Sequence, residues 1–285
     1  MKMRSDFAVF ILTHGRPDKV HTYDTLMNCG YDGKVYIVCD NQDKTVGDYK
    51  KNFPNKVVIF DKKAVAETFD TADNFEDMRA IVYARNACFQ IAKDLDVKYF
   101  IQLDDDYTDF RYKMDGEGRF IHRKGIEDIN VIFSLLVDFL EATPTKTIAM
   151  AQGGDFLGGI ESSSAKKRSP KRKAMNSFVC SVDRPFQFLG RVNEDVNTYT
   201  LLGSRGDLFL TILLIALQQV QTQSNSGGMT ELYLDGGTYL KSFYSVMFCP
   251  SSVKISLMAS RHGRLHHRIT WNNTVPKILD ESYKK

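Results

Sequence analysis

Short apolar runs alternate with amphipathic stretches along residues 1–110. The runs Phe7–Thr13, Lys34–Asp40 and Lys98–Asp104 are rich in Val, Ile, Tyr and Phe and end in a polar residue, and residues 56–60 form a weaker fourth. Such runs predict buried strands. The stretch between the last two runs repeats apolar side chains at spacings of three and four, which predicts a helix packed on the sheet. The alternation favours a Rossmann-like α/β fold, in which a mixed, mainly parallel sheet is flanked by helices.

The middle of the chain adds elements of both kinds. Residues 125–143 predict an amphipathic helix, and residues 146–154 predict a strand that leads into a glycine pair. The apolar run Leu208–Leu217 is too short to span a bilayer. We expect a buried helix there.

The last third of the chain changes its pattern. Residues 231–260 alternate apolar and polar positions, and turn signals stand at residues 235–237 and 249–250. Alternation interrupted by such turns is typical of antiparallel strands. We therefore expect an antiparallel C-terminal portion.

Charge is concentrated in one segment. The chain has 285 residues and a net charge of only +3, so attraction to nucleic acid must come from local clusters. Residues 158–177 contain serine, proline and many basic residues, and we expect a mobile loop there. Its basic residues are Lys166, Lys167, Arg168, Lys171, Arg172 and Lys173. They predict sequence-independent contacts to DNA phosphates, although a solvated loop has the same composition.

The cysteines and the N-terminus bear on the cellular compartment. Five cysteines, with no CxxC or CxxH spacing, argue against a disulfide framework or a zinc knuckle and favour a reducing cytoplasm. The apolar run near the N-terminus is too short for a secretory signal. We expect no interaction with a membrane.

Three adjacent aspartates follow the third apolar run. Asp104, Asp105 and Asp106 repel one another, and a divalent cation such as Mg²⁺ or Mn²⁺ would neutralise them. A solvated acidic turn is the alternative, but this run abuts a buried strand at the sheet edge where ligands bind in such folds. If the segment is extended, Asp104 and Asp106 face one way and share the metal, and the loss of Asp105 is tolerated best.

Two further polar motifs lie on predicted helices. Arg85 and Asn86 interrupt an apolar helix face, where Arg85 either reaches a phosphate or base or forms a surface salt bridge. Asn193 is a candidate N-cap, with Glu194 and Asp195 in the first turn. Carboxylates there stabilise the helix dipole or serve as a general base.

The C-terminal tail brings histidines and an aromatic residue. His266 and His267 point opposite ways if the segment is extended, so at most one of them faces a given site, as a metal ligand or a phosphate contact. The pattern does not choose between them. Trp271, Phe186 and Phe188 are candidates to stack on a nucleic-acid base, or else core residues.

Together these motifs resemble a GT-A glycosyltransferase: a strand ending in THGRP, a second ending in Asp40, a helix with ARN, a strand delivering DDD, then NED and a late histidine. Longer blocks, among them FDTADNFEDMRAIVYARNACF and KRKAMNSFVCSVDRPFQFLGRVNEDVNTYT, resemble the TET-associated glycosyltransferases, a group encoded largely by bacteriophages. The resemblance covers nearly the whole chain. It implies one GT-A domain over residues 1–285, with a nucleotide-binding half at 1–110 and an acceptor and catalytic half at 111–285.

The resemblance also implies roles for individual residues. The nucleotide sugar would contact Thr13, Gly15, Arg16, Asp40, Arg85, Asp104 and Asp105. Asp104 and Asp106, with His266 or His267, would hold Mn²⁺ or Mg²⁺. Asp195, or less favourably Glu194, would be the base of an inverting reaction.

Members of the group are understood to attach a sugar to hydroxymethylated pyrimidines in DNA, which shields phage genomes from host nucleases. The resemblance therefore implies a nucleotide-sugar donor such as a UDP-sugar, 5-hydroxymethylcytosine in DNA as the acceptor, and action in the cytoplasm of the infected bacterium. Two alternatives come from the residues alone. They are a metal-dependent nuclease and a non-catalytic DNA-binding protein with a degenerate GT-A fold.

Overall fold

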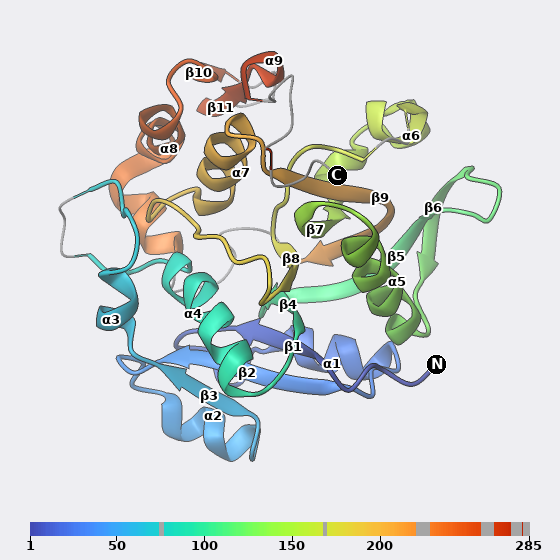
Figure 1. The fold of residues 1–285 in the computed structure, drawn as a ribbon, viewed down its shortest axis with the longest axis vertical. Helices are drawn as coiled ribbons and strands as arrows, with labels where there is room; N and C mark the ends of the chain where they lie inside the picture. The colour runs from blue at the N-terminus through green and yellow to red at the C-terminus, as the bar shows by residue number, and fades with distance from the viewer. Residues whose placement is uncertain (74–76, 168–169, 221–228, 258–264, 275–280, 282–285) are drawn as a thin grey trace.

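The structure is a computed structural model that describes residues 1–73, 77–167, 170–220, 229–257, 265–274 and 281. Over these residues a mixed sheet of nine strands forms the centre, in the order β3-β2-β1-β4-β8-β7-β9-β5-β6 (Figure 1). All strands except β8 and β5 run in one direction, which confirms the predicted mainly parallel α/β sheet. The strands are β1 (Phe7–Leu12), β2 (Lys34–Asp40), β3 (Val57–Phe60), β4 (Tyr99–Asp104), β5 (Tyr107–Met114), β6 (Phe120–Gly125), β7 (Thr145–Gln152), β8 (Ser177–Ser181) and β9 (Leu208–Gln219).

Helices cover both faces of the sheet, which is why every residue of β1 is buried. Successive side chains of β1 alternate between two core clusters, with Phe7 and Val9 in one and Ala8 and Phe10 in the other. The first cluster includes side chains of α1 (His21–Asn28), α2 (Val46–Asn52) and α5 (Ile129–Ala142). The second includes side chains of α3 (Lys62–Ala66), α4 (Val82–Asp94) and α7 (Glu194–Ser204).

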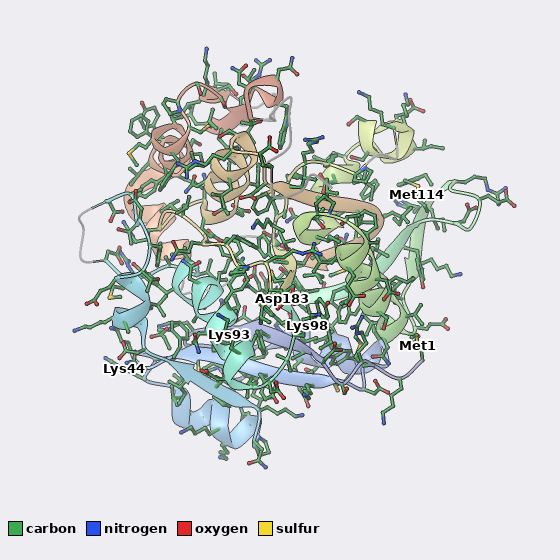
Figure 2. The ribbon with its side chains drawn as sticks, in the orientation of Figure 1. Met1, Lys44, Lys93, Lys98, Met114 and Asp183 are labelled. Carbon is green, nitrogen blue, oxygen red and sulfur yellow. The ribbon has the colours of Figure 1, made fainter. Side chains whose placement is uncertain are left out.

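The carboxyl ends of the parallel strands lie at the same end of the sheet and carry polar residues. β1, β2 and β4 are parallel neighbours, so Thr13, Asp40 and Asp104 follow or end their strands at the same edge, as the sequence predicts. β8 runs the opposite way and ends at the far edge. There Lys98 and Asp183 form an ion pair of 3.4 Å between Nζ and Oδ2 (Figure 2).

The connection from β4 to β5 bends the sheet. Only Asp105 and Asp106 separate the two strands in sequence, although β8, β7 and β9 lie between them in the sheet. Four strand spacings of a flat sheet add up to about 19 Å, whereas the three residue steps from Asp104 to Tyr107 span about 11 Å at most. The sheet must therefore curve, and the two aspartates occupy the tight turn that the curvature creates.

The apolar run that we expected to form a buried helix belongs to strand β9. β9 pairs with β7 on one side and β5 on the other. Phe209, Thr211 and Leu213 are buried whereas Leu214 is 53% exposed, the alternation of a strand. The prediction was wrong because the length of an apolar run does not show whether it forms a helix or a strand. The alternation of buried and exposed side chains identifies the strand.

The C-terminal portion combines a long helix with a small sheet. Residues 235–237, expected to form a turn, lie inside α8 (Met229–Phe248), so the strands predicted there are wrong. Tertiary contacts of α8 with α7, β10 (Val253–Leu257) and β11 (Leu265–Ile269) override the low helix propensity of the glycine pair. β10 and β11 pair antiparallel, as predicted for this portion of the chain. A last short helix, α9, spans Trp271–Thr274.

Candidate active site

The loop after β1 packs against the aspartate turn. The Thr13 hydroxyl lies 2.7 Å from the Tyr49 hydroxyl and donates to Asp105 Oδ2 at 2.6 Å. Arg16 Nη2 is 3.2 Å from Asp105 Oδ1, and the Arg16 backbone N–H donates to the Tyr49 hydroxyl at 2.8 Å. Asp105, only 2% exposed, is thus held by the loop that follows the first strand. Tyr49 contacts both Thr13 and the Arg16 backbone, and the sequence pattern did not single it out.

Asp40 has its own set of partners at the end of β2. His14 Nδ1 lies 2.8 Å and Lys62 Nζ 3.3 Å from Asp40 Oδ2. Although burial favours the neutral acid, the hydrogen bond from His14 and the charge of Lys62 hold the pKa of Asp40 below its ordinary value. Asp43, buried nearby, accepts the Gly15 backbone N–H at 2.7 Å. Of His14, Lys62 and Asp43, only His14 was marked by the sequence, because it lies inside the THGRP motif.

The three aspartates have three different surroundings. Asp104 ends β4, and Asp105 and Asp106 form a turn, so the alternation expected of an extended segment does not hold. Asp105, predicted to be the most dispensable, is the most buried of the three. Asp106 makes no ion pair with any described residue. Burial, together with the charges of Asp104 and Asp105, raises its pKa to about 7.

Arg85 lies beneath these carboxylates. It is 2% exposed, and its Nη2 is 2.9 Å from Asp104 Oδ1 while its Nε is 2.9 Å from Glu194 Oε1. The surface salt bridge considered for Arg85 is therefore wrong, and its burial does not favour the direct nucleotide contact. Asn86 hydrogen-bonds the backbone of Phe188, donating to its carbonyl at 3.0 Å and accepting from its N–H at 2.8 Å.

Glu194 and Asp195 begin α7, as predicted. Asn193 precedes them with a left-handed φ of 56°, but its side chain does not cap the helix and instead donates to the carbonyl of Lys241 at 2.7 Å. Asp195 Oδ1 accepts the Val196 N–H at 2.7 Å. Burial and the charge of Glu194 raise the pKa of Asp195 to about 7. A carboxylate with this pKa can take a proton near neutral pH.

His266 and His267 lie on β11, and their ring centroids are 4.1 Å apart rather than on opposite sides of the strand. Burial, the neighbouring His266 and the charges of Lys241 and Lys173 lower the pKa of His267 to about 3. Two lysines near an imidazole disfavour a cation there. In the described part of the chain, no group of three or more His, Cys, Asp or Glu side chains is placed to hold a metal ion.

The basic segment is more ordered than predicted. Residues Ser163–Lys167 form helix α6, and Lys171 pairs with Thr211 in an isolated β-bridge. Lys171 and Lys173 are 2.9 and 2.7 Å from Asp155 Oδ1, so Asp155 neutralises part of their charge.

The remaining basic residues of the segment differ in their partners. Lys166 forms an ion pair of 2.5 Å with Glu161. Lys167 and Arg172 are exposed. Arg168 lies outside the described residues.

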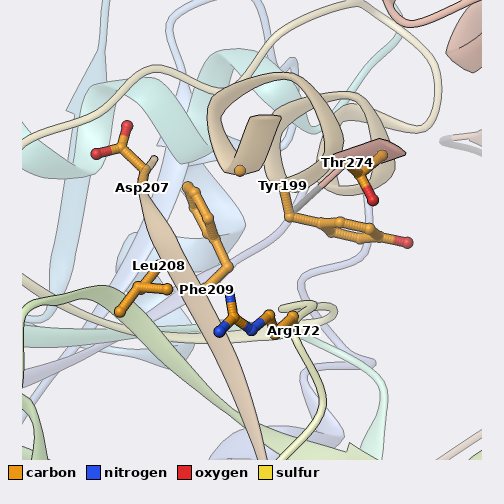
Figure 3. Close-up of a pocket in the computed structure, with 7 residues that line it drawn as sticks. Arg172, Tyr199, Asp207, Leu208, Phe209 and Thr274 are labelled. Atoms are coloured by element: carbon orange, nitrogen blue, oxygen red, sulfur yellow. The ribbon is translucent and has the colours of Figure 1, made fainter. Parts of the chain in front are cut away.

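A small pocket separates the basic segment from α7 (Figure 3). Tyr199 lines it and stacks on Trp271, with ring centroids 5.8 Å apart. Trp271 is 38% exposed, whereas Phe186 and Phe188 are buried and belong to the core. The residues that line the pocket are Arg172, Tyr199, Gly203, Asp207, Leu208, Phe209 and Thr274.

Two comparisons bear on identity. The family model described as TET-associated glycosyltransferase matches residues 7–228, a span that includes the aspartate turn, Arg85, Glu194 and Asp195 but not His266, His267 or Trp271. No curated protein matches the chain. Among the described residues, no helix is long and apolar enough to cross a membrane.

Proposed function

Because the chain belongs to the TET-associated glycosyltransferase family, it is a glycosyltransferase with a sugar donor and an acceptor, and we propose that it transfers sugar from a UDP-sugar to 5-hydroxymethylcytosine in DNA. The observation that carries the proposal is the Asp104–Arg85–Glu194 bridge. The bridge supports the proposal because it links the strand end that carries Asp104 to the first turn of α7, where Asp195, a carboxylate able to accept a proton near neutral pH, follows Glu194.

The loop after β1 supplies the nucleotide side of the proposed site. The Arg16 guanidinium offers donors for phosphate or base, and Asp40, Asp43 and Asp105 fix the conformation of this loop through His14, Gly15 and Thr13. In open α/β sheets ligands bind at this edge, beyond the carboxyl ends of the strands. Arg85 takes part indirectly, through Asp104.

Asp104 and Asp106 are the residues that would hold a divalent cation. Their carboxylate oxygens are the ligands that Mn²⁺ and Mg²⁺ prefer, and a cation would relieve the repulsion that raises the pKa of Asp106. Bound there, the metal would neutralise the leaving diphosphate. His266 and His267, beside Lys173 and Lys241, are better suited to contact an anionic phosphate.

Asp195 is the proposed base of an inverting reaction. It would accept the proton of the acceptor hydroxymethyl group while the hydroxyl oxygen forms a bond to the anomeric carbon and the bond to the diphosphate breaks, with its electron pair leaving on UDP. The ion pair of Glu194 with Arg85 favours Asp195 over Glu194 in this role. Among the basic residues that the structure describes in this segment, Lys167 and Arg172 would be the first to bind DNA.

A donor assay separates this proposal from the nuclease alternative. The protein is incubated with Mn²⁺, a panel of nucleotide sugars including UDP-glucose and UDP-arabinose, and hydroxymethylated DNA, and free UDP is quantified. We expect acceptor-dependent UDP release with at least one donor and no nicking of supercoiled plasmid. Nicking without nucleotide release would contradict the proposal. An active enzyme of this kind would modify phage DNA in the cytoplasm of the infected bacterium and shield it from host nucleases.

A further inference from the structure

Arg85 joins two parts of the site that arrive on different elements. One of its nitrogens is 2.9 Å from Asp104 at the end of β4, and another is 2.9 Å from Glu194 in the first turn of α7. The side chain is 2% exposed. It therefore acts through these two carboxylates. The sequence separation of 109 residues between Arg85 and Glu194 means that the contact exists only in the folded protein.

The surroundings hold the guanidinium in one plane. The ring of Phe178 lies 4.7 Å and that of Phe188 5.9 Å from the central guanidinium carbon. Gln102 Nε2 donates to the Arg85 carbonyl at 3.0 Å, which fixes the backbone of α4 against β4. Arginine presents its donors in a rigid planar fork, so a guanidinium packed against a ring cannot turn from one carboxylate to the other.

We infer that Arg85 is a positioning residue that fixes the helix carrying Asp195 to the strand carrying Asp104. The proposed base and the donor site then keep a fixed position relative to each other. The inference rests on the proposed function and extends it, because it gives Arg85 a role other than nucleotide binding. The predicted cap residue Asn193 makes no such tie, because its side chain points instead to α8.

The charges that face Asp195 provide an independent readout. They come from Glu194 on its own helix, Arg85 on α4 and Lys241 on α8, while Tyr199 lies one turn along α7. Burial is the largest cause that raises the pKa of Asp195 and Glu194 raises it further, whereas Arg85 and Lys241 lower it. Removing the charge of Glu194 should therefore make Asp195 ionise at lower pH.

Two variants and one matched control test the inference. Glu194→Gln keeps an oxygen that can accept from Arg85 but removes a charge, and we expect the midpoint of kcat against pH to fall by about one unit. Arg85→Lys keeps the charge, but one ammonium group cannot bridge both carboxylates. We expect kcat to fall about 100-fold, because the base is misplaced, and the KM for the donor to rise.

Arg191→Lys is the control. Arg191 is 3% exposed and pairs with Asp73 and Asp77 at 2.9 and 3.1 Å, so it matches Arg85 in burial and charge but contacts neither Asp104 nor Glu194. We expect a lower melting temperature, with the pH midpoint and donor KM unchanged.

An Arg85→Lys variant that behaves like this control would overturn the inference. If Arg85→Lys does not fold, Glu194→Ala removes the carboxylate that Arg85 bridges, and an unchanged kcat and donor KM in that variant overturn the inference. A wild-type protein that transfers no sugar would contradict the proposed function instead.

Discussion

Asp195 keeps its proton at pH values where most protein carboxylates are ionised, because it is buried beside Glu194. A base must be deprotonated to act, so the pKa of this one side chain determines the pH at which transfer begins. The position of the residue in the first helical turn was visible in the sequence. The raised pKa was not, because it depends on the burial of Asp195 in the folded protein.

We predict that kcat rises with pH through a midpoint near 7, the pKa of Asp195. Below the midpoint Asp195 is protonated and cannot accept the acceptor proton. The measurement is kcat from pH 5 to 9 at saturating donor, acceptor and Mn²⁺, where a metal bound at the proposed site would keep Asp106 ionised. A rate that is flat between pH 6 and 8 would show that another group is the base.

Asp105 and Asp106 should respond oppositely to the same substitution. Burial raises the pKa of Asp105, but Asp105→Asn leaves Arg16 without its ion-pair partner, so we expect the free energy of unfolding to fall by about 1 to 3 kcal/mol. Chemical denaturation at pH 7.5 measures it. The expectation from the sequence, that the chemistry tolerates the loss of Asp105 best, stays a prediction.

Asp106→Asn should stabilise the fold and abolish the response to Mn²⁺. The folded-state pKa of Asp106 is raised from 3.8 to about 7, so ionisation destabilises the wild-type fold progressively as the pH rises from about 4 to 7. The gain in melting temperature over wild type should grow across that window and stay constant above it. A gain that does not depend on pH would mean that Asp106 does not titrate as described.

The secondary-structure elements differ in how well the sequence pattern predicts them. The strands β1, β2 and β4 were predictable because parallel strands covered on both faces are apolar throughout, and their polar ends located the site. β9 and α8 were mispredicted. In β9 an apolar run is compatible with either structure, and in α8 the Gly-Gly pair suggested a turn until contacts with α7, β10 and β11 were known.

Neighbouring leucines test the strand assignment of β9. Leu213 is 3% exposed and Leu214 is 53% exposed. Leu213→Ala should reduce the free energy of unfolding by about 2 to 4 kcal/mol, whereas Leu214→Thr should change it by less than about 0.5 kcal/mol. Urea unfolding of both variants measures the difference. Equal losses would be inconsistent with alternating faces.

On the scale of the whole molecule, the charge available to DNA is smaller than the composition suggests. Asp155 holds Lys171 and Lys173, and Glu161 holds Lys166, which leaves Lys167 and Arg172 exposed. The sequence located the basic segment but could not show this pairing, because Asp155 lies outside the run. The family match over residues 7–228 covers both the central sheet and this basic segment.

The double substitution of Lys167 and Arg172 by Ala should weaken DNA binding. The slope of log K against log salt should become shallower by about 1 for each lost phosphate contact. Fluorescence anisotropy from 50 to 300 mM NaCl measures it. Lys51→Ala, an exposed lysine on α2, is the matched control and should leave the slope unchanged. A slope that neither variant changes would exclude the segment as the DNA contact.

The most direct measurement is the intact mass of two duplexes that differ only in one 5-hydroxymethylcytosine, after incubation with Mn²⁺ and the donor panel. The account predicts the mass gain of one sugar on the hydroxymethylated duplex, none on the plain duplex, and a loss of at least about 1,000-fold in rate with Asp195→Asn. A hydroxymethylated duplex unchanged in mass with every donor would contradict it.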